Sequence, residues 1–499
     1  MGIKSILAKP LAAIVSKQIK KWASQPVETQ QKVFSSHMAV LAQTAFGRDH
    51  GITATTTYEQ FKKQVPVRDY EALRPYLERV VAGEEDVTWK GKPLYLSKTS
   101  GTTSGVKYIP ISKESMPNHI NCARNALLMY INETGNAAFI DGGLIFLSGS
   151  PELDKKNGIF TGRLSGIVNH HVPQYLRRNQ LPSYTTNCID DWETKVDAIV
   201  GETVNKDMTL ISGIPPWVQM YFDKLTEKTG KKIKDIFPNF SVFVYGGVNF
   251  EPYRKKLIDS IGKQIDTIET YPASEGFIAF QDSQKEEGLL LVLNEGIFFE
   301  FIPTAEYFDE NPTRISLKDV QVGVNYAVIL NTNAGLWGYS IGDTVKFVST
   351  APYRLVVTGR IKHFISAFGE HVIGEEVEHA LMSVAAEEGV DVIEFTVAPY
   401  VSQTKGQSYH EWFVEFGTEP KDLAAFAKKV DEALQKKNVY YYDLIVGNIL
   451  LPLKLNSVPK NTFINYMKAE GKLGGQNKVP RLSNDRKIAD KLTELSSQS

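Results

Sequence analysis

A stretch rich in hydroxyl groups and glycine, TSGTTSGVKYIP, spans residues 99–110 and has the composition of an anion-binding loop. Its serine and threonine side chains surround Gly101 and Gly105, and Lys107 follows them. Hydroxyl groups, backbone N–H groups and a lysine ammonium are all donors to phosphate oxygens. The G-x-x-x-G-x-K spacing differs from that of a nucleotide-binding P-loop, and Pro110 opposes the helix that a P-loop requires. We therefore predict a phosphate loop between two strands, with a plain surface turn as the alternative.

Two carboxylates stand next to apolar runs that are typical of strands. Glu275 lies in ETYPASEGFIAF, where we expect it in a turn at a strand end, and Asp343 lies in LWGYSIGDTVKFV, where we expect a tight Gly-Asp turn before a strand. A carboxylate at a strand end suits Mg²⁺, which prefers hard oxygen ligands and bridges substrate phosphates. A carboxylate can also accept hydrogen bonds from both hydroxyl groups of a ribose. Taken singly, Glu275 could be a solvated surface group and Asp343 could cap a turn.

Two basic residues lie in glycine-containing segments nearer the C-terminus. In VTGRIKHF, Arg360 follows Gly359, a combination that suits a hinge between domains. In GGQNKVPRL, Lys478 belongs to a glycine-rich loop. A lysine on such a loop suits a group that reaches an active site from another domain, and it equally suits a solvent-exposed loop.

The bulk composition excludes several classes of protein. The 499 residues are 42% hydrophobic, and 56 Lys and Arg balance 57 Asp and Glu, which argues against a dedicated nucleic-acid binder. Cys122 and Cys188 are too few for a disulfide framework or a cysteine zinc site, and they fit a reduced, cytoplasmic compartment. The pair His170–His171 has no supporting carboxylate motif, so we expect no transition-metal site there.

The spacing of apolar residues changes along the chain, and this change predicts an α/β (α+β) fold. Residues 27–82 have apolar positions at helical spacing, whereas short apolar runs separated by Gly, Pro and Asn follow from Pro93 onwards. The runs read as strands are PLYLSKT, GGLIFLSGS, DMTLISGIPP, SVFVYGGVNF, IDTIETYPASEG, GIFFEFIP, NYAVILNTNAG and TVKFVST. We predict a large mixed-sheet domain over residues 1–358, a hinge at 359–362 and a smaller, mobile α+β domain over 363–499.

The N-terminal segment predicts an amphipathic helix over residues 11–24, with its lysines mostly on one face. We expect this helix to dock on the large domain, and a membrane-surface anchor is the alternative. No apolar run approaches the ~20 residues needed to span a bilayer. Ile6 stands where a myristoylation signal has Ser or Thr.

The order of these motifs resembles that of the adenylate-forming superfamily of acyl-CoA synthetases, adenylation domains and luciferases. In detail the chain is most similar to the Gretchen Hagen (auxin-responsive promoter) family of acyl acid amido synthetases. The resemblance rests on SGTTSGVKYIP (100–110), YPASEG (271–276), YSIGD (339–343), TGRIKHFISAFGEHV (358–372), QNKVPR (476–481) and the N-terminal QQKVFSSHMAVLAQTAFGRDHGI.

The resemblance implies a two-step reaction. ATP and a carboxylic acid form an acyl-adenylate and pyrophosphate, and an amine, usually an amino acid, then attacks to form an amide and AMP. It implies a phosphate loop, a nucleotide-contacting Tyr271 and Ser274, a catalytic and Mg²⁺-binding Glu275, a ribose ligand Asp343, Arg360 near the nucleotide, a catalytic Lys478, and Arg124 at the acyl carboxylate. The matching phosphate-loop residues are Ser100, Gly101, Thr102, Thr103, Ser104, Gly105 and Lys107.

The chain departs from the family pattern at three positions, and two other functions stay open. Ser340 stands where the plant proteins usually have Arg, and Pro272 and Ala273 replace small residues, so an auxin or jasmonate substrate is not implied. An acyl-CoA ligase using the same adenylate is one alternative, and a non-catalytic binding protein is the other. We expect a small-molecule acid and an amino acid as partners, no nucleic acid and no stable membrane insertion, with the oligomeric state left open.

Overall fold

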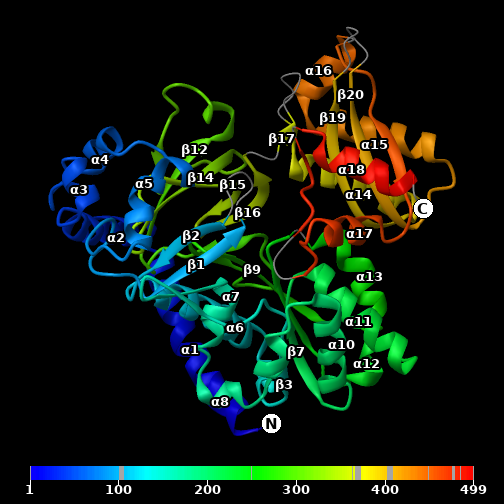
Figure 1. Cartoon of the computed structure of the whole chain (residues 1–499), viewed down its shortest axis with the longest axis horizontal. Coiled ribbons are helices and arrows are strands. Elements are labelled where there is room, and N and C mark those ends of the chain that lie inside the picture. Colours follow the sequence, from blue (N-terminus) through cyan, green and yellow to red (C-terminus); the bar gives the residue numbers. More distant parts are fainter. Residues whose placement is uncertain are drawn as a thin grey trace. The chain divides into compact units, whose positions relative to one another are not determined.

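The computed structural model describes residues 2–100, 106–248, 250–361, 364–365, 372–401, 408–447, 449–474, 478–483 and 485–497 (Figure 1). The chain divides into two compact units. The first consists of Met1–Val248 with Ser260–Val357, and the second consists of Asn249–Asp259 with Thr358–Ser499. Both units combine helices with sheets, which confirms the predicted α/β (α+β) class.

One large sheet forms the framework of the first unit, and it changes character in its middle. On one side of the change the strands run parallel, in the order β6 (Gln180–Leu181), β3 (Gly143–Phe146), β7 (Met208–Ser212), β8 (Val242–Gly246) and β9 (Asp266–Ala273). Strand β10 (Gly276–Phe280) then turns back antiparallel to β9. The sheet continues through β11 (Leu289–Leu291), β16 (Tyr353–Arg360), β15 (Tyr339–Thr350), β14 (Asn325–Thr332), β12 (Ile297–Pro303) and β13 (Ile315–Ser316).

A smaller sheet carries the two ends of the hydroxyl-rich loop. Its strand order is β2 (Val106–Ile111), β1 (Tyr95–Ser100), β5 (Ile159–Gly162) and β4 (Asp154–Lys156). Strands β1 and β2 are antiparallel, and Ser100 pairs with Val106. A strand therefore stands on each side of the loop, as predicted, and no helix follows Lys107 as a P-loop would require.

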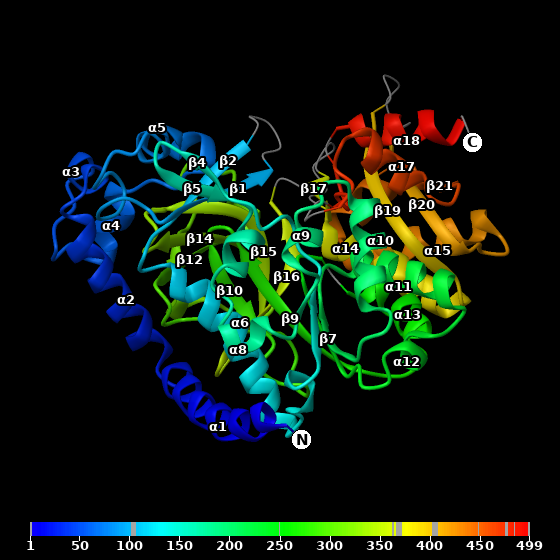
Figure 2. The same cartoon turned by 60° about the horizontal axis from the view of Figure 1, so that its bottom comes forward.

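Helices at the N-terminus and around the sheets complete the first unit (Figure 2). Their bounds are α1 (Ile3–Ala23), α2 (Pro26–Leu41), α3 (Ala45–Asp49), α4 (Tyr58–Gln64), α5 (Tyr70–Val81), α6 (Met116–Thr134), α7 (Leu164–Asn169), α8 (Gln174–Arg177), α9 (Tyr184–Asn187), α10 (Trp192–Thr203), α11 (Pro215–Thr229) and α12 (Ile233–Ile236). Across the described residues, no helix is both long and apolar enough to cross a bilayer.

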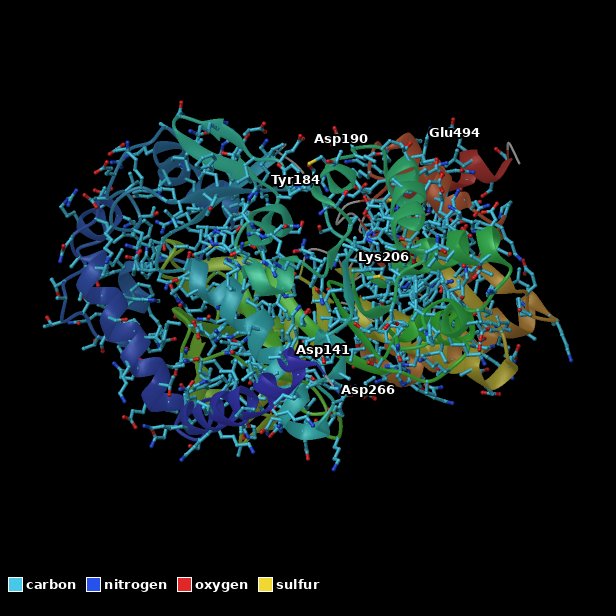
Figure 3. All side chains as sticks on the ribbon, turned by 90° about the horizontal axis from the view of Figure 1, so that it is seen from below. Asp141, Tyr184, Asp190, Lys206, Asp266 and Glu494 are labelled. Atoms are coloured by element: carbon cyan, nitrogen blue, oxygen red, sulfur yellow. The ribbon has the colours of Figure 1, made fainter. Side chains whose placement is uncertain are left out.

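Helices α1 and α6 pack together in one hydrophobic cluster that also includes sheet residues. Two acidic side chains that are labelled in Figure 3, Asp141 and Asp266, accept hydrogen bonds from this part of the chain. The Gly2 N–H donates to Asp141 Oδ2 at 2.6 Å, and the Tyr130 hydroxyl of α6 donates to Asp266 Oδ2 at 2.5 Å. The expectation that the N-terminal helix docks on the large domain is confirmed, and the helix begins earlier than predicted, at Ile3.

The second unit is built around a sheet of β19 (Asp391–Tyr400), β20 (Tyr409–Thr418) and β21 (Lys454–Val458). Its other elements are α13 (Glu251–Ile261), β17 (Phe364–Ile365), β18 (Val372–Ile373), α14 (Gly374–Glu388), α15 (Leu423–Lys437), α16 (Val439–Val446), α17 (Thr462–Ala469) and α18 (Lys487–Ser497). Trp412, Phe395 and Leu381 are fully buried in its core. Most of α13 groups with this unit, although its sequence lies between β8 and β9 of the first.

Two histidines of the first unit are buried in a neutral state. The buried ring of His37 on α2 packs edge-on against the rings of Trp89 and Trp337, with its centroid 5.6 Å from each. Burial lowers the pKa of His37 to about 3, and burial lowers the pKa of His119 on α6 to about 4. Both rings must therefore stay unprotonated for the native packing to persist.

We expect these histidines to make the first unit sensitive to acid. Their folded pKa values lie below the unfolded value near 6.5, so their contribution is complete above pH 6.5 and is lost as pH falls toward the folded pKa values. Between pH 7 and pH 5, each should remove about 2 kcal/mol from the free energy of unfolding. Urea unfolding of wild type and His37→Gln across this range checks it. The variant should show a shallower pH dependence, and an unchanged slope would contradict the assignment.

Candidate active site

Glu275 occupies the turn of the hairpin between β9 and β10, where the parallel part of the large sheet ends. Ligands commonly bind at the carboxyl ends of parallel strands, and this turn follows directly on such an end. Glu275 Oε1 accepts a hydrogen bond of 3.2 Å from the hydroxyl of Tyr339 on β15. The next residue is Gly276, at which a Cβ atom would lie 2.5 Å from Ile297 Cδ1. A side chain there would have to displace the end of the Ile297 side chain, and the φ of 158° is one that other residues rarely adopt, so this position favours glycine.

Asn118 of α6 holds the residue that follows this turn. Its Nδ2 donates to the Phe277 carbonyl at 3.1 Å, and its Oδ1 accepts from the Phe277 N–H at 2.6 Å. The Asn118 side chain is buried, and the β9–β10 register shifts just after Phe277. Asn118 therefore fixes the backbone two residues beyond Glu275. Sequence reasoning missed it, because its partner lies 159 residues away and nothing nearby distinguishes this asparagine.

Asp343 lies in a bulge within strand β15. Ala327 pairs with Thr344 and Ile329 pairs with Ser340, so residues 341–343 stand opposite Val328 alone. Gly342 has a φ of 82°, a conformation that favours glycine. The expected tight turn before a strand is therefore a bulge inside one, and it turns the local backbone at the carboxylate.

The carboxylate of Asp343 is tied to the Glu275 hairpin through a tyrosine. Tyr271 of β9 donates its hydroxyl hydrogen to Asp343 Oδ2 at 2.7 Å, and both side chains are buried. Burial and the nearby charge of Glu275 raise the pKa of Tyr339 far above its ordinary value, so this hydroxyl stays protonated and can donate. Two tyrosines thus act as neutral donors to the two predicted carboxylates.

Strand β1, which leads into the hydroxyl-rich loop, contacts the turn that carries Glu275. Ser97 of β1 donates its hydroxyl hydrogen to Ser274 Oγ at 3.1 Å, next to Glu275 in the sequence. The Lys107 ammonium on β2 lies 5.3 Å from the centroid of the Tyr70 ring. The contacts bring together Tyr271, Ser274, Glu275, Asp343 and the strand that leads into the loop. Gly101, Thr102, Thr103, Ser104 and Gly105 lie outside the described residues, and Ser100 ends β1 just before them.

The arrangement offers Mg²⁺ one hard oxygen ligand. In the part of the chain that the structure describes, no three or more His, Cys, Asp or Glu side chains gather into a group that could hold a metal by themselves. Glu275 fits an ion whose remaining ligands come from substrate phosphates and water, which is the usual way in which proteins bind Mg²⁺. The two adjacent histidines have separate partners, since His170 Nε2 lies 2.7 Å from the Pro151 carbonyl oxygen and His171 Nε2 lies 3.0 Å from the Tyr95 hydroxyl.

The remaining predicted residues lie elsewhere on the described chain. Arg124 is exposed on α6, where its guanidinium donates to Asn125 Oδ1 at 3.1 Å, and no contact joins it to Glu275 or Asp343 among the described residues. Arg360 is the last residue of β16 and is exposed. Lys478 is exposed in the second unit.

The segment that carries Lys478 is fixed to the edge of β19. Thr396 Oγ1 donates to the Pro480 carbonyl at 2.7 Å, and the Val397 N–H donates to the Arg481 carbonyl at 3.0 Å. These bonds begin two residues beyond Lys478. The lysine therefore stands next to a segment that is held like an added strand.

A cluster of charges around Arg481 strengthens this attachment. Its Nε donates to Glu378 of α14 at 2.9 Å, and its Nη1 forms an ion pair with Glu394 of β19. Its Nη2 donates to the Tyr253 hydroxyl of α13 at 2.8 Å. The guanidinium also lies 4.5 Å from the centroid of the Phe395 ring. The sequence indicated this arginine only as the end of a loop motif. In the structure, three separate elements hold it in place.

Comparisons with known proteins identify the family of the chain. The chain matches the GH3 family N-terminal domain over residues 15–180, the GH3 family central domain over 290–360 and the GH3 family C-terminal domain over 375–487. It is 23% identical to a jasmonoyl–L-amino acid synthetase, JAR4 of Nicotiana attenuata, over 77% of this chain and 78% of the relative. It is 22% identical to an indole-3-acetic acid-amido synthetase, GH3.3 of Arabidopsis thaliana, over 91% of this chain and 88% of the relative.

Solved structures share the fold. The GH3.15 acyl acid amido synthetase in complex with 2,4-DB has a TM-score of 0.79 at 16% identity, covering 97% of this chain and 96% of the other. A 2-hydroxyisobutyryl-CoA ligase in the postadenylation state has a TM-score of 0.63 at 12% identity, covering 96% and 93%. Three family domains matched in order, together with the converging motifs, establish that the chain belongs to the GH3 family.

Proposed function

We propose that this chain is an ATP-dependent ligase that activates a carboxylic acid as an acyl-adenylate and transfers the acyl group to an amine, most fittingly an amino acid. AMP and pyrophosphate are the other products. The observation that carries the proposal is the convergence of the loop strands, Glu275 and Asp343 in the first unit. The family's relatives named as amino-acid conjugating synthetases support it.

The first unit supplies most of the groups that bind the nucleotide. Asp343, held by the Tyr271 hydroxyl, accepts hydrogen bonds from ribose hydroxyl groups. Lys107 and the donors of residues 100–105 neutralise the phosphate oxygens. Glu275 would hold Mg²⁺, which would supply positive charge to the phosphates. Arg360 near the nucleotide and Arg124 at the acyl carboxylate complete the proposed set.

The second unit supplies Lys478, which acts in the adenylation step and not in the attack by the amine. Transfer of AMP to a carboxylate concentrates negative charge on the α-phosphate, and a positioned ammonium at Lys478 stabilises it. A hinge at residues 359–362 between domains 1–358 and 363–499 lets this lysine leave before the amine attacks. Lys362 and His363 lie outside the described residues.

A pyrophosphate-release screen tests the function. Carboxylic acids are offered with ATP and Mg²⁺, with hydroxylamine to trap the acyl-adenylate, and with amino acids or CoA as acceptors. We expect acid-dependent pyrophosphate release, hydroxamate formation and an amide product. A CoA thioester in place of the amide would make the chain an acyl-CoA ligase, and tight ATP binding without release for any acid would make it a binding protein.

Replacing Asn118 should weaken the Mg²⁺ binding that we assign to Glu275. Asn118→Ala removes two hydrogen bonds to the Phe277 backbone, worth about 1 kcal/mol each. If this loss falls on Mg²⁺ binding, the Mg²⁺ concentration for half-maximal adenylation should rise by about 30-fold. Asn118→Asp keeps the acceptor for the Phe277 N–H and should fall between wild type and alanine.

Asn132→Ala is the matched control, because Asn132 is an exposed asparagine of the same helix that bonds only to Ser16 in the described structure. Its Mg²⁺ dependence should equal that of wild type. A folded Asn118→Ala protein with an unchanged Mg²⁺ dependence would show that this asparagine does not position Glu275.

Replacing Lys478 should lower the rate of adenylation without a matching loss of ATP affinity. Lys478→Ala should slow adenylation by about 10²–10³-fold, the usual effect of losing one positioned donor, while ATP affinity changes little. Lys472→Ala, an exposed lysine of the same segment, serves as control. Wild-type adenylation by Lys478→Ala would remove Lys478 from the proposed mechanism.

A further inference from the structure

Helix α1 has two apolar faces, and only one of them is used by the fold. Ala8, Ala12, Val15 and Ile19 are buried in the cluster shared with α6. The side chains on the opposite face are aliphatic and exposed, namely Ile3 (77%), Ile6 (57%), Leu7 (65%), Leu11 (45%) and Ile14 (57%). Because the buried face already attaches the helix, the core does not require the exposed side chains.

The exposed aliphatic side chains form one continuous stripe. They recur at spacings of three and four residues, which places them on the same side of a helix. From Ile3 to Ile14 the stripe is about 16 Å long at the helical rise per residue. Figure 2 shows α1 along the outer edge of the first unit.

The charges of the same helix all have one sign. Residues 2–27 contain Lys4, Lys9, Lys17, Lys20 and Lys21 and no Asp or Glu, in a chain whose net charge is -1. Within the part of the chain that the structure describes, none of these lysines belongs to an ion pair. Lys17 and Lys21 follow Ile14 at helical spacing, so the aliphatic stripe continues directly into a basic end.

We propose that α1 binds the surface of an anionic lipid bilayer. The helix lies parallel to the membrane, the stripe from Ile3 to Ile14 enters the boundary between headgroups and acyl chains, and the lysines contact lipid phosphates. Amphipathic helices with an aliphatic face and lysine-rich borders bind membranes in this manner, without spanning them. Long lysine stems allow the ammonium groups to reach the headgroups while their methylenes cover apolar surface.

The composition of the face favours lipid over protein partners. Protein interfaces concentrate their binding energy in Trp, Tyr and Arg, and the exposed face of α1 from Ile3 to Lys21 has none of these residues. A second copy of this chain, docked through the same face, would bring two lysine-only helices together, and their like charges would repel. An anionic membrane matches both the apolar stripe and the charge.

Cosedimentation of the full chain with lipid vesicles tests the proposal. Wild type should bind vesicles of phosphatidylcholine with phosphatidylglycerol at least tenfold more tightly than vesicles of phosphatidylcholine alone. Ile6→Ser with Leu7→Ser should reduce this binding at least tenfold, and Lys17→Gln with Lys21→Gln should reduce it most at low salt. Val322→Ser, which removes an exposed aliphatic side chain elsewhere in the first unit, and Lys63→Gln should leave binding unchanged.

The substitutions are on exposed positions of α1, so their urea midpoints should match wild type and confirm intact folding. Equal vesicle binding by wild type and the Ile6→Ser, Leu7→Ser protein would overturn the proposal, as would no binding by wild type. A concentration-dependent dimer in sedimentation velocity that the same double variant abolishes would assign the stripe to a second copy instead. Adenylation activity is measured in parallel. Vesicle binding does not depend on it, so the two proposals can fail separately.

Discussion

The reversal of chain direction between β9 and β10 is the constraint on which the candidate site depends. Up to β9 the strands run parallel and end at a common edge, and β10 returns along β9. A carboxylate in that turn lies at the edge where the parallel strands end. Because the turn is short, its backbone is held by the two strands that it joins. Gly276 permits the close approach of the turn to Ile297, and Asn118 fixes Phe277 on the other side. The position of Glu275 is therefore determined by backbone contacts, and the side chain adds the charge.

Tyrosine hydroxyl groups connect the separate motifs of the first unit. Tyr271 of β9 bonds to Asp343 of β15, and Tyr339 of β15 bonds to Glu275 in the β9–β10 turn, so each pair joins a phenol to a carboxylate. A buried carboxylate without a donor would be costly, and a phenol that stays protonated satisfies it without adding a competing positive charge. Each carboxylate has two oxygens with several lone pairs, so it can bind a cation or accept from a ligand hydroxyl group in addition to its phenol.

In the second unit, the predicted catalytic lysine lies next to a buried ionic cluster. Lys478 is exposed, whereas Arg481 three residues later is largely buried among two carboxylates and a phenol. Removing one partner from such a buried charge cluster is strongly destabilising, so the cluster holds its segment in one arrangement. An exposed lysine beside a fixed anchor can reach outward while its base stays in place. The contribution of Tyr253 is notable because α13 lies more than two hundred residues earlier in the chain.

Local patterns in the sequence determined the mixed α/β class, the strands on both sides of the hydroxyl-rich loop and the family. Short apolar runs between Gly, Pro and Asn predict strands because burial and turn chemistry act over a few residues, and motif residues keep their order whatever the fold. The tertiary structure alone decided that Asp343 lies in a bulge, that Asn118 holds Phe277, that Arg481 anchors the Lys478 segment and that α1 exposes a second apolar face. Each of these depends on a partner from a distant part of the chain, or on which of two apolar faces the core covers. No local pattern contains that choice, because it is made by packing between elements.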